Sequence, residues 1–216
     1  MKYRGDKRDI KAVFFDLGKV LLHFDHNNII KRLLSRSKPD AAKKEGLFRF
    51  LFDAKEGLCN RYDEGTISSR DFFLEIDSMF ALGMGYDEFV PLWNDIFTEN
   101  TDVASLMRRV RDAGRPVYLL SNVNELHWEF VKGRFPALSG MDGWVLSYEV
   151  KSKKPAPAIY KAALDMAGAG PGETVFIDDL EENTAASASC GIKGLTFKGA
   201  GVLESELTEL GLIGLG

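Results

Sequence analysis

The chain has 216 residues, of which 45% are hydrophobic, so it is long enough and apolar enough to bury a sizeable core. Its 28 basic and 32 acidic residues give a net charge of −4 without the clustered basic stretch that nucleic-acid binding requires, so we expect no nucleic-acid partner. No apolar run approaches the roughly 20 residues that span a bilayer, and the start, MKYRGDKRDIKAVFF, has charges where a signal peptide has its apolar segment, so we expect a cytoplasmic protein with no membrane partner.

A long insertion is predicted near the start of the chain. The apolar run from Val13 to Phe15 predicts a buried strand, but the next segment with strand character begins near Val117. This separation is far longer than a single crossover helix requires. We therefore interpret residues 25–98 as an inserted cap domain, and residues 1–24 and 99–216 as the core.

The inserted segment has hydrophobic residues at helical spacing. They form four groups: Ile29, Ile30, Leu33 and Leu34; Leu47, Phe48, Leu51 and Phe52; Phe72, Phe73, Ile76, Met79 and Phe80; and Phe89, Leu92, Trp93, Ile96 and Phe97. Ser68 or Ser69 is a suitable N-cap for the third group, and Asp87 is one for the fourth. The cap is therefore expected to be helical.

From Thr101 onward, helices and strands are predicted to alternate. The expected helices are 102–113, 124–132, 157–167, 181–190 and 202–210, and the expected strands are 117–120, 144–148, 174–177 and 194–197. Strands that are short, continuous apolar runs are typical of parallel sheets covered on both faces. The sequence therefore predicts an α/β fold with a Rossmann-like parallel sheet flanked by helices.

Polar residues follow three of the predicted strands at the point where each strand ends. Asp16 follows the first strand, and Ser121 and Asn122 follow the strand predicted at 117–120. The pair Asp178 and Asp179 follows the apolar run VFI of the strand predicted at 174–177. Open α/β folds bind ligands along the carboxyl edge of the sheet, so these side chains are expected to meet there.

Each of these groups has a possible role in phosphate chemistry. A carboxylate such as Asp16 can attack phosphorus, and the Ser121 hydroxyl beside a helix N-terminus suits phosphate oxygens. Lys154, in a loop, can neutralise both the nucleophile and the phosphate. Taken singly, these three residues are more typical of loop and capping positions. Asp178 and Asp179 differ, because adjacent carboxylates at a buried edge repel each other unless a cation compensates, and they predict a Mg²⁺ site.

Together, the four segments resemble the motifs of the haloacid dehalogenase superfamily. The segments are FFDLGKVLLHFD, LLSNVN, KKPAPAIY and FIDDLEEN, which occur in the expected order with a helical cap between the first and the second. The resemblance covers the whole chain. It implies a hydrolase with a Rossmann-like core, Mg²⁺ as cofactor and a small phosphorylated metabolite as substrate.

The resemblance also implies a role for each site residue. Asp16 would be the nucleophile and a metal ligand, and the backbone carbonyl of Gly18 would be a second ligand. The phosphate would be held by Ser121, Asn122 and Lys154, and Lys154 would also stabilise charge. Asp179 would bind Mg²⁺ with Asp178 beside it. Asn183 would contact these ligand residues without binding the metal itself.

The variants DLGKV, SNVNELH and YDEGTIS are most similar to a branch of sugar-phosphate phosphatases. That branch includes a glucose-1-phosphate phosphatase and lies near the phosphatase domain of epoxide hydrolases. We therefore predict a Mg²⁺-dependent phosphatase of small phosphorylated metabolites, sugar phosphates among them, that works through an aspartyl-phosphate. The alternatives are a haloacid dehalogenase, which needs no divalent cation, and a non-catalytic phosphate-binding module. The sequence does not indicate the oligomeric state.

One position departs from the usual pattern of the superfamily. Most of its phosphatases carry a second Asp two residues after the nucleophile, as general acid and base, and Gly18 stands at that place here. Candidates for a replacement, by proximity in sequence, are His23, Asp25, His26 and His127. Candidates for substrate contacts in the cap, beside the turn at Gly65, are Arg61, Tyr62 and Glu64.

Overall fold

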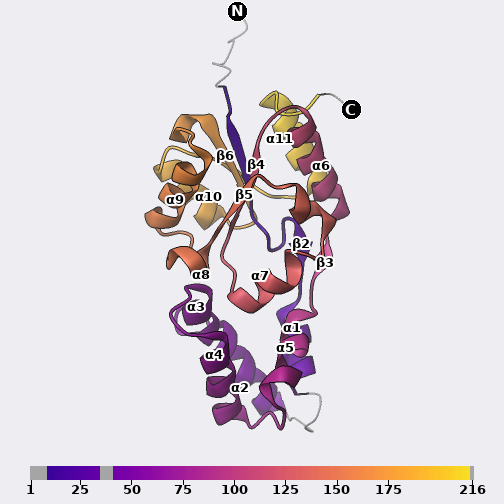
Figure 1. The fold of residues 1–216 in the computed structure, drawn as a ribbon, viewed down its shortest axis with the longest axis vertical. Helices are drawn as coiled ribbons and strands as arrows, with labels where there is room; N and C mark the ends of the chain where they lie inside the picture. The colour runs from indigo at the N-terminus through magenta and orange to yellow at the C-terminus, as the bar shows by residue number, and fades with distance from the viewer. Residues whose placement is uncertain (1–8, 35–40, 215–216) are drawn as a thin grey trace, which may run out of the picture.

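The computed structural model describes residues 9–34 and 41–214. Within these ranges the chain forms a parallel sheet with helices on both faces, and a separate group of helices lies beyond one end of the sheet (Figure 1). The predicted α/β fold with a Rossmann-like sheet is confirmed.

The sheet has five parallel strands in the order β5-β4-β1-β6-β7. Their bounds are β1 (Ala12–Phe15), β4 (Val117–Ser121), β5 (Gly143–Leu146), β6 (Thr174–Asp178) and β7 (Lys193–Thr196). The central strand β1 pairs with β4 and β6, so that Phe15 lies opposite both Leu119 and Ile177. Every residue of β1 and β6 is buried, which is expected of strands covered on both faces.

Alternate residues of β1 enter hydrophobic clusters on opposite faces of the sheet. Val13 and Phe15 pack in the cluster that includes residues of α6 (Thr101–Asp112) and α11 (Ala200–Glu209). Phe14 packs in the cluster that includes residues of α9 (Pro157–Ala167) and, half-buried, of α10 (Glu181–Ser189). The side-chain period of two along a strand therefore divides the core into two layers.

The elements predicted after Thr101 are confirmed to within two residues at each end. The helix that follows β4 is α7 (Glu125–Val131), with Asn124 as its N-cap. The strand predicted to reach residue 148 is wrong in its last two residues, because α8 (Ser147–Val150) begins at Ser147. The Ser147 hydroxyl accepts a hydrogen bond from Val123 N at 3.0 Å, and this contact links the start of α8 to the loop after β4.

The helices of the inserted segment have a hydrophobic cluster of their own. They are α1 (His26–Leu33), α2 (Ala41–Phe52), α3 (Leu58–Asp63), α4 (Ser69–Phe80) and α5 (Tyr86–Asn94). Ser68 is the N-cap of α4, as predicted, and accepts from Asp71 N. The prediction of Asp87 as N-cap is wrong, because α5 begins one residue earlier, at Tyr86. The N-cap is Gly85, whose N–H donates to Glu88. Because this cluster is separate from the core of the sheet, we propose that residues 25–98 act as a cap domain.

The sequence did not predict helix α3 or a short ribbon at the base of the cap. The six residues of α3 bury only Leu58 and Tyr62, which is too few for a helical period to be recognised. The ribbon consists of β2 (Leu22–His23) and β3 (Thr98–Glu99), which pair in antiparallel orientation. It brings the two ends of the insertion together.

In the described ranges, no helix combines the length and the hydrophobicity that a bilayer crossing requires.

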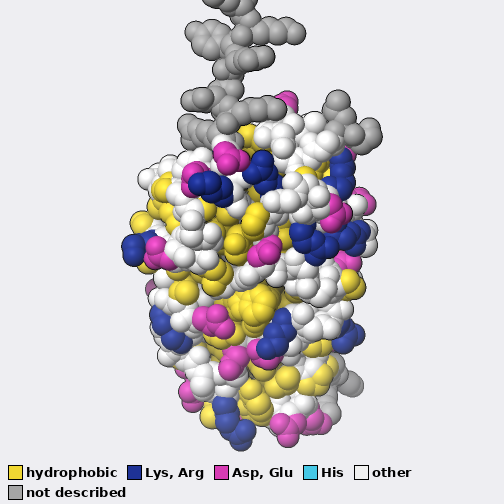
Figure 2. All heavy atoms as spheres, turned by 45° about the horizontal axis from the view of Figure 1, so that its top comes forward, with side chains coloured by type: hydrophobic (Ala, Val, Ile, Leu, Met, Phe, Trp, Pro, Cys, Tyr) yellow, Lys and Arg dark blue, Asp and Glu magenta, His cyan; other side chains and the backbone are white. Residues whose placement is uncertain are grey.

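Figure 2 shows that Lys and Arg side chains lie among Asp and Glu side chains on one face, with hydrophobic side chains between them. Among the exposed hydrophobic residues of the molecule is Trp144, whose ring packs at 5.1 Å against that of buried Trp128. Charges of both signs are therefore mixed on the face in this view.

Candidate active site

Three polar residues lie at the carboxyl ends of neighbouring strands. Asp16 directly follows β1, while Ser121 and Asp178 are the last residues of β4 and β6. Because β1 pairs with both neighbours, the strand order places these residues side by side at one edge of the sheet. The Asp16 N–H donates to the carbonyl of Ile177 at 2.9 Å, which extends the pairing of β1 and β6 to the site itself.

Lys154 reaches into this edge and contacts two of the carboxylates. Its ammonium lies 2.8 Å from Asp16 Oδ1 and 2.6 Å from Asp178 Oδ2, and it also donates to the carbonyl of Leu120 at 3.0 Å. Lys154 is buried, and these acceptors account for all three of its protons. The structure therefore brings together the first, third and fourth sequence motifs, as predicted.

The charges at this site influence one another strongly. Burial alone would lower the pKa of Lys154, but the carboxylates of Asp16 and Asp178 outweigh it and raise that pKa, so the ammonium stays charged. Burial raises the pKa of Asp16, and the Asp178 charge adds to this effect while Lys154 opposes it. A further cation beside Asp16 would favour its ionised form.

The two oxygens of Asp16 lie in different environments. Oδ1 accepts from Leu17 N at 2.8 Å and contacts the Lys154 ammonium. Oδ2 accepts no hydrogen bond from any of the described residues. One oxygen is therefore fixed by protein donors, while the other is available for a ligand.

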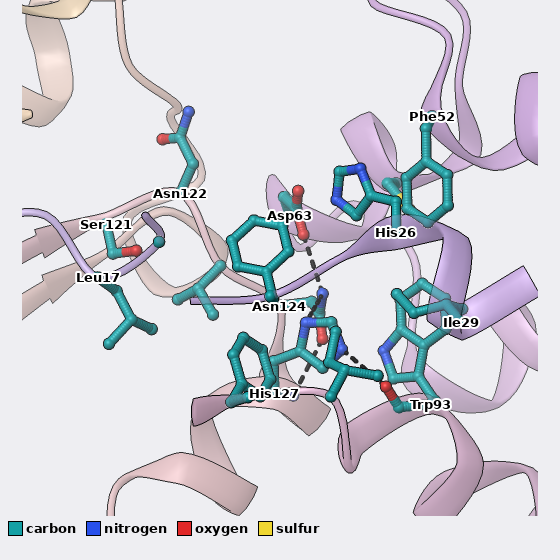
Figure 3. A pocket seen from close by; sticks show the side chains of 16 residues that line it. Leu17, His26, Ile29, Phe52, Asp63, Trp93, Ser121, Asn122, Asn124 and His127 are labelled. Carbon is teal, nitrogen blue, oxygen red and sulfur yellow. Dashed lines mark hydrogen bonds between the residues drawn. The ribbon is translucent and has the colours of Figure 1, made fainter. Parts of the chain in front are cut away.

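Asn122 positions Lys154 rather than pointing into the site. Its Oδ1 accepts from Lys154 N at 2.8 Å, and its Nδ2 donates to Lys154 O at 3.0 Å. Figure 3 shows the Asn122 side chain turned away from the other labelled residues. The side chain of Asn122 therefore holds the backbone of Lys154 at both its N–H and its carbonyl.

A set of carboxylate oxygens that fits a divalent cation lies at the same edge. One oxygen from each of Asp16, Asp178 and Asp179 lies within 4.8 Å of the others. An all-oxygen donor set suits a hard cation such as Mg²⁺, and the donors therefore fit the metal that the sequence predicted. Gly18, whose carbonyl was the other predicted ligand, lies two residues after Asp16 in the adjoining turn.

Asp178 and Asp179 differ in how many protein donors they contact. Asp178 accepts from Leu180 N and from Asn183 Nδ2, in addition to its contact with Lys154. Asp179 is half-buried, and the ammonium of Lys19 lies 3.7 Å from its Oδ2. Burial, together with the Asp178 charge, raises the pKa of Asp179. Asp179 therefore contacts fewer protein donors than Asp178 does.

A cavity of about 90 Å³ lies between this sheet edge and the cap (Figure 3). Residues on the core side that line it include Leu17, Gly18, Ser121, Asn122 and His127. Residues on the cap side include His26, Ile29, Phe52, Cys59, Asp63 and Trp93. Most of the cap-side groups are apolar or aromatic, and Asp63 is the carboxylate among them.

Asn124 connects the cap to the core through a defined set of hydrogen bonds. Its Oδ1 accepts from His127 N, so its Nδ2 must be the donor, and this group lies 3.1 Å from Asp63 Oδ1 and 3.2 Å from His127 Nδ1. The Nδ1 atom of His127 is therefore the acceptor, and its Nε2 carries the proton that is donated to Trp93 O at 3.2 Å. Burial lowers the pKa of His127 to about 3, so this imidazole is neutral.

The four candidates for the missing acid lie in different surroundings. His23 and Asp25 are exposed on β2 and at the N-cap of α1, and neither lines the cavity. His26 lines the cavity and stacks on Phe52 at 4.0 Å, and burial lowers its pKa. His127 also lines the cavity, but both of its ring nitrogens are occupied.

The cap contributes a cavity residue that was not predicted from the sequence. None of Arg61, Tyr62 and Glu64 lines the cavity, but their neighbour Asp63 does. Cys59 and Asp63 are four residues apart on α3, so they lie on the same face of the helix. The four-residue spacing of Cys59 and Asp63 could have indicated that both side chains face the cavity. It has this meaning only in a helix, and α3 was not predicted.

Comparison with known families identifies the chain over most of its length. The model of the haloacid dehalogenase-like hydrolases matches residues 10–191. Over 209 residues the chain is 25% identical to a D-ribitol-5-phosphate phosphatase of Bacteroides thetaiotaomicron, covering 93% of this chain and 98% of that one. Over 214 residues it is 25% identical to the sesquiterpene phosphatase astK of Aspergillus oryzae, covering 93% and 96%.

A solved structure shows the same fold. It is the crystal structure of the HAD family enzyme bt-2542 from Bacteroides thetaiotaomicron, with a TM-score of 0.77 and 30% sequence identity over 92% of this chain and 98% of that one. The same enzyme in complex with magnesium and inorganic phosphate superposes with a TM-score of 0.75 and 30% identity, covering 88% and 94%.

Proposed function

The chain belongs to the haloacid dehalogenase-like hydrolases, and we propose that it is a Mg²⁺-dependent phosphatase of small phosphorylated metabolites. One observation carries the proposal. The Lys154 ammonium bridges Asp16 and Asp178 at the ends of adjacent strands, and a third carboxylate, Asp179, lies within reach of the same point. A nucleophile, a fixed cation and a set of oxygen ligands thus share one edge of the sheet.

The cofactor would be held by oxygens of Asp16 and Asp179 and by the carbonyl of Gly18, with Asp178 beside them. When bound, Mg²⁺ would neutralise negative charge on the phosphate and lower the pKa of Asp16. Asp178 would act mainly through Lys154 and Asn183, because its own oxygens already accept from these two residues.

Asp16 would attack the phosphorus of the bound ester through one carboxylate oxygen. The bond from phosphorus to the leaving oxygen breaks, and an aspartyl-phosphate remains on Asp16. Water then attacks this phosphorus, and the carboxylate of Asp16 is released together with inorganic phosphate. Lys154 stabilises the negative charge of the phosphoryl oxygens, and the Ser121 hydroxyl donates a hydrogen bond to one of them.

The substrate class is supported by the relatives and by the cavity. One relative is a phosphatase of a pentitol phosphate and another is a sesquiterpene phosphatase, so both are phosphatases of small organic molecules. The cavity of about 90 Å³ fits a small leaving group. Sugar phosphates and sugar-alcohol phosphates are therefore the first substrates to test.

A panel of phosphate esters, assayed for phosphate release with Mg²⁺ and with EDTA, tests this function. The panel should include D-ribitol 5-phosphate, glucose 1-phosphate, glycerol 3-phosphate and p-nitrophenyl phosphate. We expect Mg²⁺-dependent release from at least one ester, and loss of that release in Asp16→Asn. Halide release from a 2-haloacid without Mg²⁺ would support a dehalogenase instead. Phosphate binding without turnover of any ester would indicate a non-catalytic module.

A further inference from the structure

The usual position of the general acid holds no acidic side chain in this protein. Gly18 has no side chain, and a Cβ built on it would lie 2.8 Å from Phe24 Cε1. Any side chain at position 18 would therefore require the Phe24 ring to shift. An alkyl leaving group still needs a proton, and a positioned general acid typically contributes roughly 10²–10⁴-fold to the rate.

Asp63 lines the cavity beside residues that neighbour the nucleophile. It lies at the last position of α3 and lines the same cavity as Leu17, Gly18 and Ser121, which flank the nucleophile. A leaving group that enters this cavity therefore shares its lining with both Asp63 and the residues near the nucleophile. Figure 3 shows the Asp63 carboxylate between the core-side residues and the aromatic residues of the cap.

One oxygen of Asp63 is held and the other remains available. Oδ1 accepts from Asn124 Nδ2, and Asn124 is itself fixed as the N-cap of α7. Oδ2 accepts no hydrogen bond from the part of the chain that the structure describes. The backbone carbonyl of Asp63 separately accepts from the Ser147 hydroxyl, so α3 is attached to the core without the carboxylate. Attachment of the cap to the core therefore uses one oxygen of the carboxylate and leaves the other toward the cavity.

We propose that Asp63, carried by the cap, is the general acid and base of the reaction in place of a residue at position 18. The proposal rests on the proposed phosphatase function. As Asp16 bonds to phosphorus, the bond from phosphorus to the leaving oxygen breaks, and the Asp63 proton moves to that oxygen. The product alcohol leaves, and Asp63 is ionised.

The second step restores the starting state. Ionised Asp63 takes a proton from a water molecule as the water oxygen bonds to phosphorus. The bond from phosphorus to Asp16 breaks and its electrons return to the Asp16 carboxylate. Inorganic phosphate leaves, Asp63 is protonated again, and no other reactant is consumed.

The surroundings of Asp63 suit this alternation. Burial raises its pKa to about 6, while Asn124 and Lys153 act against this effect and Glu64 adds to it. The other titratable groups that line the cavity are Cys59 on α3 itself, His26 on α1 and His127 on α7. A carboxyl group with a pKa near neutrality can act both as an acid and as a base at the operating pH.

The test compares leaving groups in the Mg²⁺-loaded enzyme and its Asp63→Asn variant. An Asn side chain keeps the shape of Asp63 and can still accept from Asn124, but it cannot donate a carboxylic proton. Values of kcat/KM report the step in which the alcohol leaves. We expect Asp63→Asn to lose roughly 10²-fold in kcat/KM for glycerol 3-phosphate, and less than about tenfold for p-nitrophenyl phosphate, whose leaving group needs no proton.

The pH profile supplies a second readout. For glycerol 3-phosphate, kcat/KM of the parent should fall as pH rises above about 6, because the acid must be protonated, and this dependence should be absent from Asp63→Asn. Asp87→Asn, which changes an exposed cap carboxylate, is the matched control and should behave like the parent.

Three results would overturn the proposal. Equal losses of kcat/KM on both esters would mean that Asp63 has a structural role, and no loss of kcat/KM on either ester would mean that another group supplies the proton. Turnover of p-nitrophenyl phosphate without turnover of glycerol 3-phosphate or D-ribitol 5-phosphate by the parent would mean that no residue does. Absence of any phosphatase activity in the parent would instead overturn the proposed function, and the assignment of Asp63 with it.

Discussion

The ring of Phe24 packs directly over Gly18, so that a Cβ at position 18 would lie 2.8 Å from Phe24 Cε1. Phe24 is in turn held by Phe97, at a ring distance of 5.8 Å, and by His26, at 5.1 Å. The Phe24 ring can therefore lie where it does because Gly18 has no side chain. An acid cannot be restored at position 18 without moving an aromatic cluster.

This relationship predicts the outcome of Gly18→Asp. The substitution alone should lower the free energy of unfolding by about 1–3 kcal/mol, because an overpacked site forces its neighbours to move. In a Phe24→Ala background the same substitution should cost at least about 0.5 kcal/mol less, since the two positions are in contact. Urea unfolding of the parent, both single variants and the double variant measures this coupling. If the two substitutions change the free energy of unfolding additively, the side chain at position 18 does not press on the Phe24 ring.

The proposed covalent role of Asp16 predicts a separation of binding from turnover. Asp16→Asn should fold, because its side-chain oxygen can still accept from Leu17 N and Lys154, but it should not hydrolyse any ester. Beryllium fluoride, which mimics a phosphoryl group on a carboxylate, should inhibit the parent. Phosphate release by Asp16→Asn at the rate of the parent would disprove the nucleophile assignment, and Asp87→Asn serves as the active control.

Asp178 and Asp179 should differ when each is replaced by Asn. Asp178 is fully buried against Lys154, so Asp178→Asn should lower the free energy of unfolding by about 3 kcal/mol, since it leaves a buried ammonium short of one partner. Asp179→Asn should leave stability nearly unchanged but weaken Mg²⁺ binding at least tenfold by rough estimate. Urea unfolding and calorimetric Mg²⁺ titration separate the two effects, and the opposite pattern would reverse the roles.

His127 should make stability depend on pH. Its folded pKa of about 3 lies below the ordinary value of 6.5, so between these values the unfolded chain binds a proton that the folded chain does not. The contribution to stability is complete above pH 6.5 and is lost as the pH falls toward 3. At pH 5 the loss is about 2 kcal/mol.

His127→Gln should lack this contribution to the pH dependence. The measurement is the change in the free energy of unfolding between pH 7.5 and pH 5, compared between the parent and the variant. Taking the difference between the two proteins removes the contribution of carboxylates that both contain. An equal change in both proteins would mean that the imidazole is not held in its neutral form.

The strands and flanking helices of the core were predictable, because each is long enough for its hydrophobic period to be read. The polar residues Asp16, Ser121 and Asp178 were predictable for the same reason, since a strand end determines a place at the sheet edge. The six-residue α3 was not, and with it Asp63 was missed. The side-chain role of Asn122 and the packing of Phe24 on Gly18 also depend on contacts between distant segments, which no local pattern encodes.

The antiparallel ribbon of β2 and β3 has a consequence for the architecture of the chain. Leu22 lies opposite Glu99, and His23 lies opposite Thr98, so the chain leaves the core and returns to it at a single point. A tight turn joining His23 to Thr98 could replace everything between them without stretching the sheet. The ribbon is thus a junction at which caps of different length or shape can be exchanged, while the carboxylates at the sheet edge keep their positions.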